Sequence, residues 1–172
     1  MTSIPAPTTR PQALTALFLA AAMAATVGGA LGFQHLGGYI PCKLCYEQRI
    51  PYYVGAPLML LAFLAALVRV PPVVTRGLLL AGGLLMAYGV YLGVYHSGVE
   101  WGFWPGPTDC GMVVAPSDTG GNGVLDSLNS VMPPSCDKAA LRILGLSLAG
   151  WNAIASLVLA IVAFRGAFAK AR

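Results

Sequence analysis

Four cysteines are the residues of this 172-residue chain whose type and spacing could carry chemistry. Cys42 and Cys45 form a Cys-x-x-Cys pair, and Cys110 and Cys136 follow later in the chain. A Cys-x-x-Cys pair can close a small disulfide, and its thiolates can exchange with other disulfides. Both pairs fall in polar segments between long apolar runs. The four residues therefore predict a thiol relay at a membrane surface.

The sequence around Cys45 favours its thiolate form. An apolar run over residues 50–68 follows the pair, so the pair is expected at or just before a helix N-terminus, whose partial positive charge stabilises anions. Arg49 lies four residues after Cys45, hence on the same helical face, and Lys43 is close by. The simpler interpretation of Arg49 is that its side chain only extends to the lipid headgroups.

The composition excludes a soluble protein. The chain is 57% hydrophobic and 9% charged, whereas soluble domains carry about 25% charged residues. A helix that spans a bilayer needs about 20 mostly apolar residues, and the sequence contains such spans at 11–33, 50–68, 77–95 and 143–164. We therefore predict an all-α integral membrane protein, a single domain over residues 1–172 in which four transmembrane helices form a bundle. Its outer loops are residues 34–49 and 96–142.

The charged residues predict the orientation. One face of the bundle would carry six of the ten Lys and Arg residues and no acid: Arg10, Arg69, Arg76, Arg165, Lys170 and Arg172. By the positive-inside rule both termini are cytoplasmic and both cysteine loops lie outside, in a compartment where disulfides persist. A cleaved signal peptide is the alternative for the first span, but its apolar stretch of about 20 residues is longer than the usual h-region, and no clean Ala-x-Ala cleavage site precedes Gln34. The net charge of +4 is scattered and predicts no nucleic-acid partner.

The second outer loop predicts a short amphipathic helix that rests on the bilayer surface. Its apolar residues recur at helical spacing, opposite Asp126 and Asn129: Val124, Leu125, Leu128, Val131 and Met132. Pro133 and Pro134 end this helix just before Cys136. Cys136 would therefore lie on a hinge between the surface helix and the fourth span.

Small and polar residues inside the spans predict helix contacts. Glycines four residues apart, which let another helix approach closely, occur in the first and third spans as Gly28 with Gly32 and Gly89 with Gly93. Asn152 and Ser156, one turn apart in the fourth span, most simply form hydrogen bonds between helices. Pro51 is expected near the start of the second span, where its missing N–H costs little, and Pro57 is expected to kink that span.

Structural interpretations of the same residues stay open. The Cys-x-x-Cys pair could be a static disulfide or half a zinc site, but zinc usually needs a second close pair, and Cys110 and Cys136 are 26 positions apart. Those two could form a simple loop staple that stabilises the fold by ~3 kcal/mol. His35 and His96, at the outer ends of the first and third spans, would permit a bis-histidine haem. The competing class is thus a membrane scaffold or haem-binding subunit with purely structural disulfides.

Over nearly its whole length the chain resembles the disulfide bond formation protein B (DsbB) family. The resemblance rests on the four spans, on the cysteine pair of the long outer loop, and on two motifs, Pro41-Cys-x-Leu-Cys-x-x-x-Arg49 and Gly145-Leu-Ser-Leu-Ala-Gly-Trp-Asn152. It implies a thiol:quinone oxidoreductase of the bacterial inner membrane. Such an enzyme reoxidises a periplasmic thioredoxin-like dithiol oxidase of the DsbA type and passes the electrons to ubiquinone or menaquinone.

The resemblance also implies roles for individual residues. The thiol of the partner would attack Cys110, and Cys136 would exchange with Cys42. The thiolate of Cys45 would face the quinone ring, and Arg49 would hold or polarise the quinone. The Gly-rich stretch of the second outer loop departs from the family pattern, so the residues that contact the partner cannot be transferred. No metal ligand is predicted.

Overall fold

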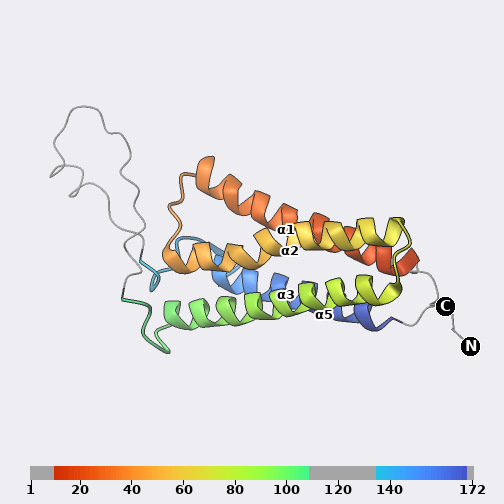
Figure 1. Cartoon of the computed structure of the whole chain (residues 1–172). Coiled ribbons are helices and arrows are strands. Elements are labelled where there is room, and N and C mark those ends of the chain that lie inside the picture. Colours follow the sequence, from red (N-terminus) through yellow and green to blue (C-terminus); the bar gives the residue numbers. More distant parts are fainter. Residues whose placement is uncertain (1–9, 109–134, 170–172) are drawn as a thin grey trace, which may run out of the picture.

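The computed structural model describes residues 10–108 and 135–169, and four long helices make up most of them (Figure 1). They are α1 (Arg10–His35), α2 (Lys43–Leu67), α3 (Pro72–Glu100) and α5 (Leu148–Phe168). Each helix is long and apolar enough to cross a membrane. The prediction of an all-α membrane protein built as a four-span bundle is therefore confirmed.

Successive helices run in opposite directions along the bundle (Figure 1). The start of α1, the α2–α3 connection and the end of α5 lie at one end, and the α1–α2 connection and residues 135–147 lie at the other. Cys42 belongs to the α1–α2 connection, and Cys136 belongs to the segment before α5. The described cysteines thus lie at the same end of the bundle.

The core of the bundle is apolar and draws on all four helices. Its large buried side chains come in pairs from α1, α2 and α3, joined by residues of α5: Leu19, Met23, Tyr52, Met59, Leu79, Met86, Leu159 and Ala163. The outward faces are apolar too, with exposed residues such as Leu14, Leu61 and Leu84. Because lipid accepts apolar side chains on the outside of a bundle, this distribution fits a membrane environment.

The glycine pairs differ in their packing. A Cβ atom added at Gly93 would lie 2.8 Å from the backbone nitrogen of Ala153, and one added at Gly89 would lie 2.8 Å from Ser156 Oγ. The close contact predicted for the third span is therefore confirmed, and its neighbour is α5. The prediction for Gly28 and Gly32 is wrong, because an added Cβ would meet nothing within 4 Å. Only the half of α1 up to Met23 is buried, and its outer end diverges from α2 (Figure 1).

Several helix ends differ from the predicted span limits. Helix α2 begins at Lys43, before the expected residue 50, so Pro51 lies well inside the helix and its predicted place near the start is wrong. Helix α3 continues past residue 95 to Glu100. Residues 43–49 and 96–100, which the sequence analysis placed in loops, are therefore helical. A helix can extend beyond the hydrocarbon layer when its outer turns are packed against protein.

The fourth span begins later than residue 143. Residues 142–147 form a hairpin in which β1 (Arg142–Ile143) pairs with β2 (Leu146–Ser147), and α5 starts only at Leu148. The two turn residues Leu144 and Gly145 have φ angles of 54° and 83°. Positive φ at both central residues is the geometry of a tight two-residue hairpin. The amphipathic helix predicted for residues 124–132 lies outside the described residues.

Candidate active site

The Cys-x-x-Cys pair lies at the N-terminus of α2, as predicted. Cys42 is the N-cap residue, with φ −77° and ψ 173°, and its Sγ accepts a hydrogen bond from the backbone N–H of Cys45 at 3.3 Å. The two sulfur atoms are 2.7 Å apart, and both residues are free cysteines. The positive end of the helix dipole therefore lies at the dithiol and favours negative charge there.

The two thiols have unequal environments. Cys42 is 4% exposed, whereas Cys45 is half-buried. The hydrogen bond to Cys45 and burial raise the pKa of Cys42, because both favour its neutral thiol. In the reduced pair the proton therefore stays on Cys42, and Cys45 is left as the sulfur that can carry negative charge.

Cys136 lies beside Cys42, although 94 positions separate them in the sequence. The sulfur atoms of Cys42 and Cys136 and a ring nitrogen of His96 all lie within 4.8 Å of one another, and all three residues are buried. Cys136 is disulfide-bonded. Cys110, the other predicted relay residue, lies outside the described residues. A free thiol against a disulfide sulfur in a buried site is an arrangement that permits thiol–disulfide exchange.

The same three groups are also of the types that bind Zn²⁺. Zinc is held by cysteine thiolates and histidine nitrogens, usually four in a structural site. The sulfur of Cys136 belongs to a disulfide and therefore cannot act as a thiolate ligand in this oxidation state. Among the residues that the structure describes, this cluster is thus better suited to exchange than to metal binding.

Arg49 connects α2 to the outer half of α1. Its guanidinium donates to Gln34 Oε1 at 2.6 Å and to the backbone oxygen of Ala30 at 3.4 Å, and it lies 5.4 Å from the centre of the Tyr46 ring. Arg49 therefore does more than extend to the headgroups. These contacts hold its charge one helical turn from Cys45, on the same face of α2.

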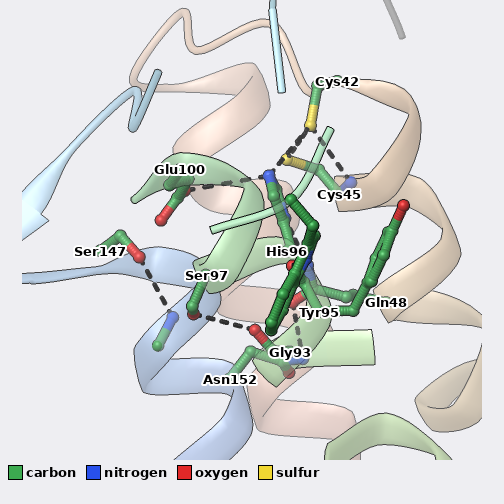
Figure 2. Close-up of polar contacts among 12 residues, drawn as sticks. Cys42, Cys45, Gln48, Gly93, Tyr95, His96, Ser97, Glu100, Ser147 and Asn152 are labelled. Atoms are coloured by element: carbon green, nitrogen blue, oxygen red, sulfur yellow. Dashed lines mark hydrogen bonds and ion pairs between the residues drawn. The ribbon is translucent and has the colours of Figure 1, made fainter. Parts of the chain in front are cut away.

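Histidine 96 is the residue that sequence reasoning left without a role. Its Nε2 lies 3.7 Å from Cys42 Sγ and 3.8 Å from Glu100 Oε1, and its Nδ1 contacts Gln48 Nε2 (Figure 2). Both ring nitrogens thus face protein groups. These contacts give both ring nitrogens of His96 partners within the protein, which argues against the bis-histidine haem interpretation.

A chain of hydrogen bonds continues from His96 into the bundle. Asn152 Nδ2 donates to Gln48 Oε1, Tyr52 Oη donates to Asn152 Oδ1, and Tyr52 Oη also bonds Ser156 Oγ, each at 2.7 Å. The chain joins α2, α3 and α5. The prediction that Asn152 and Ser156 form hydrogen bonds between helices is confirmed.

The sequence contains a signal for this hydrogen-bond network. Each of the three helices carries two polar residues four positions apart, and these share one helical face: Gln48 with Tyr52, His96 with Glu100, and Asn152 with Ser156. Buried polar groups in a bilayer need partners. Three such pairs near the outer end of three spans therefore indicate a shared network.

Comparisons with known proteins agree with this site. The family model "Disulfide bond formation protein DsbB" matches residues 12–165. The chain is 29% identical over 162 residues to a Disulfide bond formation protein B of Polaromonas sp. (strain JS666 / ATCC BAA-500), with 88% of each chain covered. It is 28% identical over 129 residues to an uncharacterized protein of Rickettsia prowazekii (strain Madrid E), covering 74% of this chain and 72% of the relative.

No solved structure matches the chain. The family model nevertheless covers most of the sequence, including Cys42, Cys45, Cys136 and the helices that position them. With its four spans and its cysteine cluster at one end of the bundle, this chain belongs to the DsbB family of membrane proteins that form disulfide bonds.

Proposed function

We propose that this protein oxidises the dithiol of a periplasmic thioredoxin-like oxidase of the DsbA type and passes the two electrons to a membrane quinone. The proximity of the two cysteine segments supports this most strongly. Cys42 is a free thiol, Cys136 is disulfide-bonded, and their sulfur atoms lie within 4.8 Å of each other. A loop staple alone would need no second dithiol against it.

The proposed reaction begins with two exchange steps. A thiolate of the partner attacks Cys110, the Cys110–Cys136 disulfide breaks, and Cys136 leaves as a thiolate. Cys136 then attacks the sulfur of Cys42 in an oxidised Cys42–Cys45 pair, that disulfide breaks, and Cys45 leaves as a thiolate. Each step forms one S–S bond and breaks another, so the two electrons move along the chain without an external oxidant.

Cys45 and Arg49 are the residues that would hold the quinone. Arg49 is kept in place by Gln34 and the backbone of Ala30, and it could donate a hydrogen bond to a quinone oxygen. Phe33, which precedes Gln34 in the sequence, and Ile50, which follows Arg49, are exposed apolar residues, so a lipid-soluble molecule could approach from the bilayer. A bound quinone would accept two electrons and two protons and leave as quinol. We expect ubiquinone, with menaquinone as the alternative.

The same proposal includes a location. Arg10, Arg69, Arg76 and Arg165 lie towards the end of the bundle that is opposite the cysteines. The positive-inside rule then supports a multi-pass protein of the bacterial inner membrane with cytoplasmic termini and both cysteine loops in the periplasm.

An anaerobic assay tests this function. Purified protein is mixed with quinone and a reduced DsbA-like partner, and quinone absorbance is followed. We expect one quinone lost per partner dithiol in the wild type, and none with Cys45→Ala or Cys110→Ala. Gly28→Ala serves as the control, because its added Cβ meets nothing within 4 Å. Unchanged quinone with a partner that stays reduced would support the structural-disulfide interpretation instead.

A further inference from the structure

The hydrogen-bond chain behind Cys42 has a direction. Tyr52 Oη donates to Asn152 Oδ1, which leaves the amide nitrogen of Asn152 to donate to Gln48 Oε1. Gln48 then presents its own amide nitrogen to His96 Nδ1. An amide nitrogen can only donate, so Nδ1 must accept. A neutral imidazole with an acceptor at Nδ1 carries its proton on Nε2.

The groups around Nε2 are suited to that proton. Nε2 lies 3.8 Å from a carboxylate oxygen of Glu100 and 3.7 Å from Cys42 Sγ. Carboxylate oxygens and thiolate sulfurs accept hydrogen bonds. His96 and Gln48 are 3% and 6% exposed, so water does not compete for these contacts.

We propose that Gln48 and Asn152 are positioning residues that hold His96 as the Nε2–H tautomer, so that it presents a hydrogen-bond donor to Cys42 where Cys42 meets Cys136. His96 is the residue that touches the reacting sulfur. Gln48 and Asn152 act through it, and Tyr52 and Ser156 complete the chain that orients Asn152.

This inference rests on the proposed relay, in which a Cys42–Cys136 disulfide forms and is then resolved. In the resolving step the second thiol of the partner first breaks the partner–Cys110 mixed disulfide and leaves with its own disulfide closed. The freed thiolate of Cys110 attacks Cys136, the Cys42–Cys136 bond breaks, and the electron pair of that bond stays on Cys42. The N–H at Nε2 then donates to the new thiolate and stabilises it as a leaving group. Hydrogen bonds to charged groups are stronger than those to neutral ones.

The tautomer can be measured directly by NMR of the detergent-solubilised protein labelled with ¹⁵N-histidine. A His35→Asn background leaves His96 as the only histidine. We expect the proton on Nε2 in the otherwise unchanged protein. In Gln48→Glu the carboxylate can only accept, so the proton should move to Nδ1. Ser97→Ala is the control, because Ser97 is buried beside His96 and its hydroxyl donates to Gly93 O in its own helix. A proton on Nδ1 in the background protein, which requires the reverse direction of the chain, would overturn the inference.

Kinetics separate positioning from mere packing. Asn152→Leu should slow quinone reduction about ten- to a hundredfold, the range expected for one hydrogen bond to a charged group. The milder Tyr52→Phe should slow it less. In a His96→Phe background, Asn152→Leu should have little further effect, because its route of action is gone. A full effect of Asn152→Leu in that background would show that Asn152 only holds the helices together.

The two proposals can fail separately. The NMR measurement needs neither quinone nor partner. An Nε2–H tautomer in a protein that never reduces quinone would therefore contradict the proposed function but not the positioning of His96 by Gln48 and Asn152. Quinone reduction by a protein with the His96 proton on Nδ1 would support the proposed function and contradict the proposed positioning of His96.

Discussion

Cys42 and Cys45 differ in chemistry although they share one turn of α2. Cys42 is buried, caps the helix and retains its proton, whereas Cys45 is half-buried and is followed one turn later by Arg49. The sequence alone predicted a reactive Cys45, because helix position and a nearby cation can be read from spacing. The pKa of Cys42 is raised by its hydrogen bond to Cys45 and by burial. That burial could not be read from spacing, because Cys136 and His96, which lie against Cys42, come from other parts of the chain.

This asymmetry predicts different alkylation of the reduced pair. Cys45 should react with iodoacetamide first at neutral pH. Because the pKa of Cys42 is raised, Cys42 should stay unreactive as the pH rises through the range where an ordinary thiol ionises, at about 8.5. Mass spectrometry of peptides alkylated from pH 6 to 10 measures both rates. Faster labelling of Cys42 would contradict the assignment of its proton.

Arg49 carries a second prediction at this scale. Arg49→Lys keeps the charge but loses the planar fork that donates to both Gln34 and Ala30 O. We expect the KM for quinone to rise about tenfold, the equivalent of one lost hydrogen bond, while the KM for the partner stays unchanged. Steady-state kinetics with Arg165→Lys, an exposed arginine near the other end of the bundle, provides the matched control. An unchanged KM for quinone would contradict a role for Arg49 in binding the quinone.

Among the elements, α3 and α5 are held by close contact. Gly93→Ala would place a methyl group within 2.9 Å of Ala153 backbone atoms, which cannot move aside as a flexible side chain could. Overpacking of this kind typically costs about 1–3 kcal/mol, so the free energy of unfolding should fall by that amount. Thermal unfolding in detergent should therefore give a lower Tm for Gly93→Ala.

Gly28→Ala is the matched control for that experiment. Its added Cβ meets no atom within 4 Å, so the Tm should stay unchanged or rise slightly through better helix propensity. Equal Tm values for both variants would contradict the close α3–α5 contact.

Much of the element structure could be predicted from the sequence, because apolar spans are long and continuous. The helix ends could not, since polar residues such as Arg49 and His96 mark the end of an apolar window, whereas the helices continue outward to Lys43 and Glu100. The hairpin at 142–147 was also missed, because Ile143, Leu144 and Leu146 read as part of the apolar run. The His96 network could not be assembled from spacing, because it depends on how three helices rotate toward one another.

For the whole molecule, the central prediction is its orientation. In a cysteine-free background, Leu36→Cys lies on the exposed α1–α2 connection and Val68→Cys lies on the exposed α2–α3 connection, with 92% and 73% exposure of the native residues. A membrane-impermeant maleimide should label Leu36→Cys in spheroplasts and should label Val68→Cys only after permeabilisation. The reverse pattern would place the cysteine site in the cytoplasm, where the relay would meet a reducing environment.

The relay depends on one contact, that of Cys42 with Cys136, and it can be trapped. The doubly substituted variant Cys45→Ala with Cys110→Ala leaves Cys42 and Cys136 as the only cysteines. After mild oxidation in membranes, mass spectrometry of the protease-digested protein should find these two joined in one disulfide-linked peptide pair. Two separate reduced cysteines under conditions that oxidise the wild-type pairs would contradict the relay.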